Sequence, residues 1–259
     1  MRLAIGVEYL GKNYCGWQSQ INGISVQSLL EDAITYVASH PVKVQCAGRT
    51  DKGVHALEQV VHFDTSSKRD NSQWLLGINC NLPQDIKVKW VKPTEDEFHA
   101  RFSAESRTYH YYIYNNPTPS AILADNMLWF PYGLDLDLMQ QAALKMIGEH
   151  DFSSFRSSKC QAKSPIKTIY KLDIIKRNDN VIVVVIKANS FLYNMVRNIL
   201  GVLLAVGKGK NNLDWVDSVI ASRSRSSADV KISAKGLYFI KADYPDCFKL
   251  EQCVEKYLF

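Results

Sequence analysis

Residues 44–65 read VQCAGRTDKGVHALEQVVHFDT, with two apolar ends around a polar, turn-forming middle. Apolar and polar residues alternate over 42–46, and apolar residues cluster over 59–64, which is typical of two β-strands. Gly48 and Gly53 lie between these segments, and glycine adopts backbone angles that other residues resist. The stretch therefore predicts a loop held between two core strands, which is a common position for functional residues.

This loop carries one carboxylate among cations. Asp51 is its only acidic residue, and Arg49 and Lys52 flank it. Positive neighbours favour the ionised form of a carboxyl group, so we expect Asp51 to be an anion that can act as a nucleophile or a base. Taken alone, the spacing of these residues favours a different interpretation, an ordinary hairpin loop in which the aspartate caps a turn.

The chain has 259 residues, of which 46% are hydrophobic and 22% charged, as in ordinary soluble globular proteins. That length suits one large domain or two small ones. The N-terminus lacks the apolar core of a signal peptide, and no apolar run is long enough to cross a bilayer. We therefore expect a cytoplasmic protein with no membrane association. The six cysteines include no CxxC pair and no zinc-finger spacing, which predicts free thiols.

Positive charge is in mild excess and is unevenly distributed. Lysine and arginine number 31 against 26 aspartates and glutamates, a formal charge of +5. Such an excess permits an anionic partner, and clustering strengthens the case for nucleic acid, although a solvated face explains any single cluster. The clustered basic residues are Lys159, Lys163, Lys167 and Lys171, then Lys208 and Lys210, and then Arg223 and Arg225.

The order of predicted elements repeats along the chain. The first set has strands at 3–7, 42–46, 59–64 and 86–91, with helices beginning after Ser25 and capped by Asn71. The second has strands at 108–114, 167–175, 181–186 and 236–242, with helices from Asp135, over 191–206 and over 213–222, and a proline-marked insertion at 115–132. This predicts an α+β protein of two ferredoxin-like βαββαβ halves, 1–104 and 105–259, with mixed or antiparallel sheets and a central cleft.

Several aromatic residues leave two interpretations open. Tyr14 and Trp17 lie in a glycine-containing loop, where they can stack on bases or close the core. Tyr109 and Tyr111 share one face of a predicted strand, and His110 and Tyr112 share the opposite face. One of those faces must be core, and the other can contact a base.

Arg197 is the one charged residue inside an otherwise apolar helical segment, 191–206. A buried charge without a partner is costly, so we expect Arg197 to have an anionic partner, either Asp51 or a phosphate. The alternative is an arginine whose head group reaches solvent past its apolar stem. The six histidines include no HExxH pair and no phosphate-binding glycine motif is present, so we expect no metal and no nucleotide cofactor.

Five segments together resemble one known family. GRTDKGVHA at 48–56 is similar to the GRTDxGVHA loop of the tRNA pseudouridine synthase A family. The segments at 9–18, 98–115, 191–201 and 236–245 resemble its YDGxxYxGWQ, FHARFSA, FLxxMVRxIxG and closing GLxLxxVxYP blocks. The chain departs from the family pattern in two places. Leu10 stands where the family usually has aspartate, and ADVKISAK at 228–235 lacks the usual proline before the last strand.

This resemblance implies an activity and a set of site residues. Asp51 is implied as the catalytic nucleophile and Tyr109 as the residue that contacts the target base. Arg49 is implied to help flip out or hold the nucleotide, Arg197 to pair with Asp51 and orient it, and Leu237 to pack against the ring. The family converts uridine to pseudouridine at positions 38, 39 and 40 of the tRNA anticodon stem-loop, as a homodimer without cofactor or metal.

Two other functions compete with this one. A non-catalytic RNA-binding module suits ferredoxin-like halves, but the chain has no RNP1-type strand motif. An N-glycoside hydrolase would usually want a pair of carboxylates, and Asp51 has no acidic neighbour in its loop.

Overall fold

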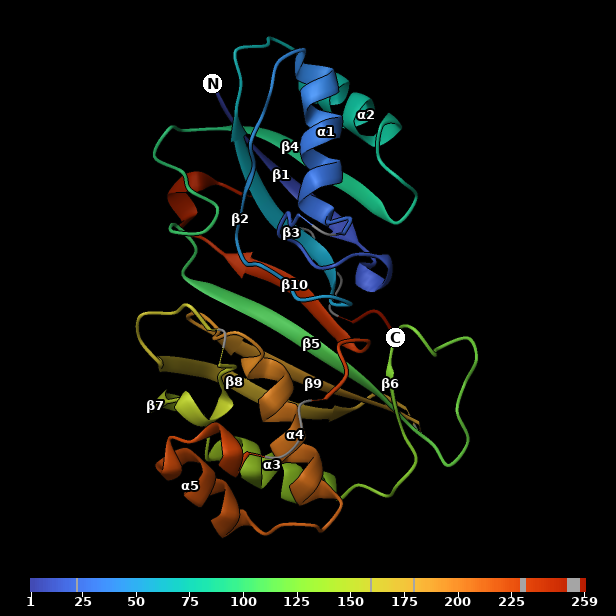
Figure 1. Cartoon of the computed structure of the whole chain (residues 1–259), viewed down its shortest axis with the longest axis vertical. Helices are drawn as coiled ribbons and strands as arrows, with labels where there is room; N and C mark the ends of the chain where they lie inside the picture. Colours follow the sequence, from blue (N-terminus) through green and yellow to red (C-terminus); the bar gives the residue numbers. More distant parts are fainter. Residues whose placement is uncertain (22, 159, 179, 229–231, 251–256) are drawn as a thin grey trace. The chain divides into compact units, whose positions relative to one another are not determined.

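A computed structural model describes residues 1–21, 23–158, 160–178, 180–228, 232–250 and 257–259. The chain divides into two compact units (Figure 1). Unit 1 comprises Met1–Arg107 and Tyr238–Leu258, and unit 2 comprises Thr108–Leu237 and Phe259. None of the helices in the described residues combines the length and apolar character that crossing a bilayer requires.

Unit 1 is a twisted sheet with helices packed against it (Figure 1). Its elements are β1 (Arg2–Tyr9), η1 (Gly11–Asn13), α1 (Val26–Ala38), β2 (Gln45–Cys46), β3 (His55–Asp64), α2 (Asn71–Cys80), β4 (Ile86–Thr94), β10 (Leu237–Asp243) and η4 (Asp246–Phe248). The strand order is β4-β1-β3-β10, with β2 beside β3. β1 is antiparallel to β3 and β4, whereas β10 is parallel to β3. The predicted β-α-β-β-α-β order of the first half is confirmed.

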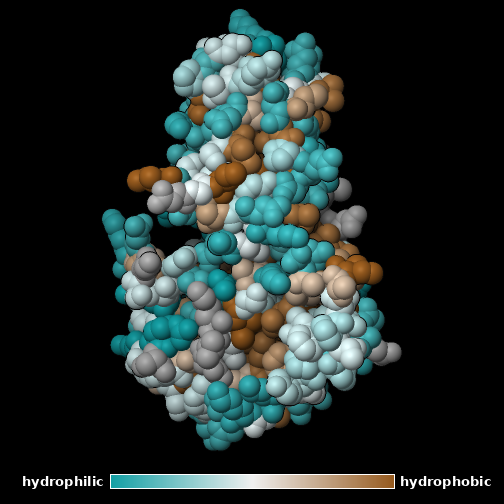
Figure 2. Space-filling view, turned by 45° about the vertical axis from the view of Figure 1, so that its right-hand side comes forward, coloured by the Kyte–Doolittle hydropathy of each residue, from teal (hydrophilic) through white to brown (hydrophobic). Residues whose placement is uncertain are grey.

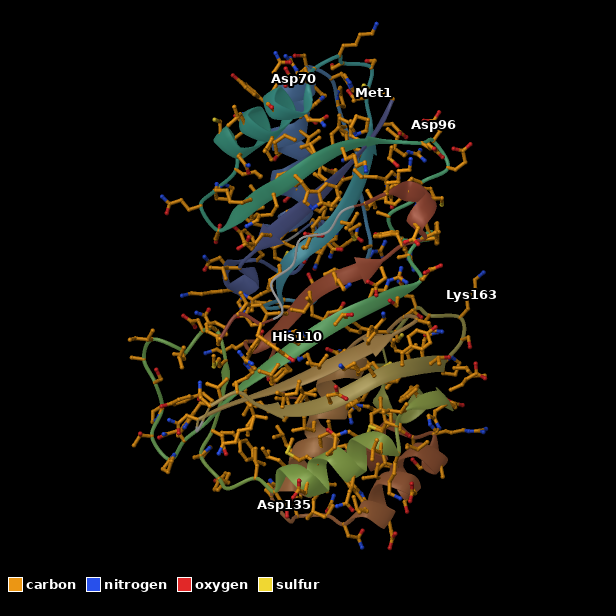
Figure 3. The ribbon with its side chains drawn as sticks, turned by 180° about the vertical axis from the view of Figure 1, so that it is seen from behind. Met1, Asp70, Asp96, His110, Asp135 and Lys163 are labelled. Atoms are coloured by element: carbon orange, nitrogen blue, oxygen red, sulfur yellow. The ribbon has the colours of Figure 1, made fainter. Side chains whose placement is uncertain are left out.

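Local sequence explains how the helices of unit 1 begin. Ser25 caps α1 as predicted, and a reciprocal bond with Ser28 completes a capping box. The second helix is capped by Asp70, not by Asn71 as the sequence suggested. Asp70 accepts a hydrogen bond from the backbone N–H of Gln73 at 2.7 Å, and the Gln73 side chain bonds back to the Asp70 N–H. Figure 3 shows Asp70 at the start of this helix.

The strands beside the Asp51 loop differ from the prediction in length. β2 has only two residues, although the apolar residues at 42, 44 and 46 are all buried. β3 begins at His55, four residues before the predicted start. The reason is that β3 pairs with β1 along almost its whole length, from Arg2 opposite Asp64 to Tyr9 opposite Ala56.

Unit 2 also combines β-strands with helices (Figure 1). Its elements are β5 (Ser106–Asn115), β6 (Leu128–Phe130), α3 (Leu136–Leu144), β7 (Gly148–Asp151), η2 (Ser153–Phe155), β8 (Ile166–Lys176), β9 (Val181–Ala188), α4 (Met195–Gly207), α5 (Leu213–Ser222) and η3 (Arg225–Ser227). Of these helices, α3 packs against β8 and also contacts α4 and α5. The strand order is β5-β9-β8-β7, and β6 runs parallel to β5. β8 is antiparallel to both β7 and β9. The mixed sheets and packed helices confirm the α+β class.

Two features of unit 2 depart from the prediction. The short strands β6 and β7 were not predicted, because each is defined by its partner strand. α4 begins at Met195 instead of residue 191, since Asn194 has a left-handed backbone (φ 64°) that precedes the helix.

The last predicted strand, 236–242, is β10. Tyr238 pairs with His55 and Phe239 with Ala56, so this strand extends the sheet of unit 1. The compact units therefore divide the chain after Arg107 and again after Leu237. Hydrophilic residues cover most of the face shown in Figure 2, and hydrophobic residues form separate small patches on it.

Candidate active site

The Asp51 loop is clamped onto the loop that follows β1. Asp51 forms an isolated antiparallel bridge with Gly16. Beside it, the Trp17 N–H donates to the Thr50 carbonyl at 3.0 Å, and the Val54 N–H donates to the Asp51 carbonyl at 3.1 Å. The backbone of Asp51 is therefore held on both sides by hydrogen bonds from fixed elements of unit 1.

Two glycines make this close approach possible. Gly16 has φ 111°, and a Cβ there would lie 2.8 Å from the Thr50 carbonyl oxygen. Gly11 passes even closer to the far end of the loop, where a Cβ would lie 1.9 Å from the Val54 oxygen. A side chain at either position would push the two loops apart, so glycine is required by contact at both positions and by backbone angle at Gly16.

Polar side chains of the sheet support the loop from below. The Tyr9 hydroxyl and the Thr50 Oγ1 share a buried hydrogen bond of 2.7 Å. Gln59 accepts from the Gly48 N–H at 3.2 Å and donates to the Gly48 carbonyl at 2.5 Å. The Gly11 N–H donates to the His55 Nδ1 at 3.1 Å, which gives this histidine a structural role. The loop is thus a rigid platform.

The side chains on this platform differ in exposure. Asp51 is half-buried, whereas its neighbours Arg49 and Lys52 are exposed. Beneath them, burial raises the pKa of the Cys46 thiol to about 12, with Arg49 opposing that rise. The thiol is therefore protonated at neutral pH. Asp51 is the only acidic residue of the loop itself.

Tyr109 lies on β5 in unit 2. Its ring meets the edge of the Phe191 ring, with centroids 5.1 Å apart, and 8% of the residue is exposed. The four residues 109–112 are all buried, so neither face of this strand is as open as the sequence alternation suggested. His110, labelled in Figure 3, shows the effect: burial lowers its pKa to about 4, aided by Lys171.

Arg197 and Leu237 also belong to unit 2. Arg197 is half-buried in the first turn of α4, where its Nε donates to the Ile232 carbonyl at 2.7 Å and its Nη1 to the Asn194 Oδ1 at 3.2 Å. Leu237 is buried at the start of β10. The predicted residues thus divide between the units, with Arg49 and Asp51 in one and the other three in the second. The pairing of Arg197 with Asp51 remains a prediction.

The aromatic residues of the N-terminal loop belong to the core. Tyr14 is 5% exposed and Trp17 is 1% exposed, so neither is available to stack on a base. The Tyr14 hydroxyl bonds to the Asp85 carboxylate, and Trp17 packs 5.9 Å from the Tyr9 ring. Of the two interpretations that the sequence left open, closure of the core is correct.

Sequence reasoning missed the supports of the loop. Tyr9 and Gly16 lie far from the loop in the sequence, and only their contacts with Thr50 reveal their role. Among the clustered lysines, Lys163 is exposed and points outward from the segment before β8 (Figure 3), whereas Lys159 lies outside the described residues.

Comparisons with known proteins agree with this geometry. A family model described as tRNA pseudouridine synthase matches residues 5–103 and 142–245. The chain is 48% identical over 250 residues to tRNA pseudouridine synthase A of Colwellia psychrerythraea, covering 96% of each chain. It is 49% identical over 245 residues to that of Aeromonas hydrophila subsp. hydrophila, covering 95% of this chain and 91% of the relative.

Among solved structures, a chain of a Cbf5–Nop10–Gar1 complex superposes with a TM-score of 0.35 and 10% identity, covering 78% of this chain and 45% of that one. A likeness this small supports no conclusion about function. The match to the family model and the identity over nearly full length are sufficient by themselves. The chain belongs to the tRNA pseudouridine synthase family, whose members isomerise uridine in tRNA to pseudouridine.

Proposed function

We propose that the chain isomerises uridine at positions 38, 39 and 40 of the tRNA anticodon stem-loop, with Asp51 as the nucleophile. One observation carries this proposal: the only acid of the loop is half-buried and its backbone is fixed by Gly16 and Val54. Covalent catalysis needs a nucleophile held in place, and a rigid loop meets that requirement.

The reaction requires no net oxidation or reduction. The bond from ribose C1′ to the base N1 breaks and a bond from C1′ to C5 forms. The hydrogen on C5 leaves as a proton and N1 takes up a proton, so that the product is an isomer of the substrate. A single carboxylate at Asp51 can hold one fragment covalently while the uracil turns, and is regenerated at the end. Attack at C1′, attack at the base C6 and removal of a ribose proton are three routes by which Asp51 can serve.

A uridine inside a stem must leave the stack before Asp51 can reach it. Extrusion costs a few kcal/mol, and stacking on an aromatic ring returns about 1–3 kcal/mol per base. In this proposal Tyr109 contacts the extruded base, and the exposed Arg49 holds the nucleotide by its charge. Arg197 orients Asp51, and Leu237 packs against the base.

We further propose that the chain acts as a homodimer in the cytoplasm. This extension rests on the family resemblance and on tRNA as the substrate. A dimer allows one tRNA to contact both subunits, so that one subunit docks the tRNA while the other modifies it. Crosslinking of tRNA to a mixture of two distinguishable subunits tests this arrangement, and a footprint confined to one subunit contradicts it.

Tritium release from tRNA labelled at uridine C5 tests the chemistry. We expect release by the native chain and none by Asp51→Asn, because the amide keeps the shape of the side chain but is not a nucleophile. Asp32→Asn is the matched control: it removes the same charge from an exposed position on α1 and should release tritium normally.

Three other results would each change the conclusion. Release by Asp51→Asn at the native rate would remove Asp51 from the chemistry. Absence of release by the folded native chain on unmodified tRNA would favour a non-catalytic RNA-binding module. Loss of uracil from the tRNA, detected as a drop in RNA mass, would indicate hydrolysis.

A further inference from the structure

Unit 2 contains a polar cavity that the proposed chemistry does not use. It has a volume of about 650 Å³ and lies where η2, the first turns of α4 and the segment after α5 meet. Among the lining side chains that the structure describes there are guanidinium, hydroxyl and amide groups and no carboxylate. Such a lining donates many hydrogen bonds and carries positive charge, which suits an oxyanion. Its three arginines are Arg156, Arg223 and Arg225.

The fold holds one of these guanidiniums in a fixed position. Arg225 donates to the Asn198 Oδ1 at 3.2 Å, and Asn198 in turn donates to the Phe155 carbonyl at 2.6 Å. Asn198 is only 1% exposed, so these two bonds fix the Arg225 guanidinium to a buried side chain of α4. A guanidinium that is already oriented loses little conformational entropy when an anion binds.

A second guanidinium lacks an acceptor. Arg156 is half-buried at the end of η2, and its side chain has no hydrogen-bond acceptor among the residues that the structure describes. A guanidinium presents its donors in a planar fork that matches two oxygens of one phosphate. A phosphate in the cavity would therefore satisfy donors that the protein itself leaves open.

The charge of the cavity also favours an anion. Three arginines line the cavity, and one of them, Arg223, lies 3.4 Å from the carboxylate of Asp151. Together these four groups carry a charge of +2. That charge would balance the two negative charges of adjacent backbone phosphates.

The position of the cavity points to a particular anion. Asn194 lines the cavity and also accepts the hydrogen bond from Arg197. Ser157, another lining residue, donates its N–H to the Tyr193 carbonyl at 3.0 Å, which ties the cavity wall to the start of α4. Asn194 therefore links the cavity wall directly to Arg197, the side chain that in the proposed function orients Asp51.

We propose that this cavity binds a backbone phosphate of the tRNA beside the target nucleotide. The position of this site beside the target nucleotide rests on the proposed function, whereas its preference for an anion rests on the lining residues alone. Arg156 forms the bidentate contact, Arg223 adds charge at the rim, and Arg225 completes the cradle. A backbone phosphate has the same chemistry as free inorganic phosphate, so the test must separate the two.

The test measures tRNA affinity against salt concentration for full-length Arg156→Gln. We expect affinity to fall roughly tenfold at low salt and the slope of log affinity against log salt to decrease by about 1. At saturating tRNA the tritium-release rate should stay close to native, so that KM changes and kcat does not. Arg156→Lys should restore the slope but only part of the affinity, because a lysine is a point charge without the fork.

Lys145→Gln is the matched control, since it also removes one positive charge from unit 2. Lys145 is already paired with Asp217 at 2.6 Å, so its loss should leave tRNA affinity unchanged. If Arg156→Gln does not fold, Arg223→Gln replaces it, because that side chain is 71% exposed and its removal spares the interior.

Measuring tRNA affinity tests this proposal independently of the proposed function, because tRNA can bind without being modified. Native affinity and native salt slope in Arg156→Gln and Arg223→Gln would overturn the phosphate site, whatever the tritium assay shows. Loss of inorganic phosphate binding in these variants with unchanged tRNA binding would also overturn it, since the cavity would then take a free anion only. Loss of tritium release in Asp51→Asn together with native tRNA affinity would leave the phosphate site untouched.

Discussion

Glu58 on β3 is a buried acid whose removal should stabilise the protein. It is 3% exposed, and its Oε1 has no hydrogen-bond partner in the described part of the chain. Burial raises the pKa of Glu58 from 4.5 to about 7, against the opposing effects of the Trp90 indole and of Lys241 and Lys89. Each of these lysines has its own carboxylate, Lys89 with Glu8 at 2.6 Å and Lys241 with Asp243 at 2.7 Å.

A pKa rise from 4.5 to about 7 corresponds to about 3 kcal/mol. The folded state favours the neutral acid, so the contribution to stability is fully present below pH 4.5 and is lost as the pH rises through 7. Glu58→Gln mimics the neutral acid at every pH. We therefore expect little difference from the native chain at pH 4.5 and a gain approaching 3 kcal/mol in the free energy of unfolding at pH 8.5.

Urea unfolding at four pH values between 4.5 and 8.5 measures this difference. Glu31→Gln is the matched comparison, since Glu31 is also buried in unit 1 but bonds to Lys43 at 2.8 Å and to the Val44 N–H at 3.1 Å. The same substitution there should destabilise by about 1–3 kcal/mol, because donors lose a charged acceptor. Parallel pH curves for native and Glu58→Gln would refute the reasoning.

Three further outcomes follow from the loop and the buried histidines. Gly16→Ala, at φ 111° and against the Thr50 carbonyl, should lower Tm and tritium release together, and native values of both would contradict the clamp. Tyr9→Phe removes the 2.7 Å bond to Thr50 and should lower the free energy of unfolding in urea by about 1 kcal/mol. Thr50→Val breaks the same bond, so adding it to Tyr9→Phe should cause no further loss. Burial lowers the pKa of His62 and of His110 to about 4. The stability that these neutral histidines contribute to the folded state is therefore fully present above pH 6.5 and is lost as the pH falls through 4. A free energy of unfolding that stays constant from pH 7 to 4 in the Glu58→Gln variant would argue against this.

Local periodicity predicted the long elements of the fold. Alternation over 3–7 became β1, and the apolar face after Ser25 became α1, because both patterns bury one side of an element. The cap of α2 was misplaced by one residue, since Asp70 and Asn71 are both good caps. The reciprocal bond with Gln73 decides between them, and that signal was present in the sequence.

Features set by distant contacts could not be read locally. The start of α4 depends on the left-handed Asn194, although the apolar residues before it continue the helical pattern. β6 and β7 exist because β5 and β8 offer them partners. Likewise the loop motif identified Asp51, but its fixation by Gly16 is a tertiary contact between residues 35 positions apart.

The pairing of β10 with β3 ties the Asp51 loop to the order of protein synthesis. His55 and Ala56, which close that loop, are synthesised well before their partners Tyr238 and Phe239, which lie 183 positions later in the chain. Translation proceeds from the N-terminus, so this end of β3 lacks its β10 partner until those later residues have been made. During synthesis, the reactive loop is therefore present before the β10 pairing beside it can form.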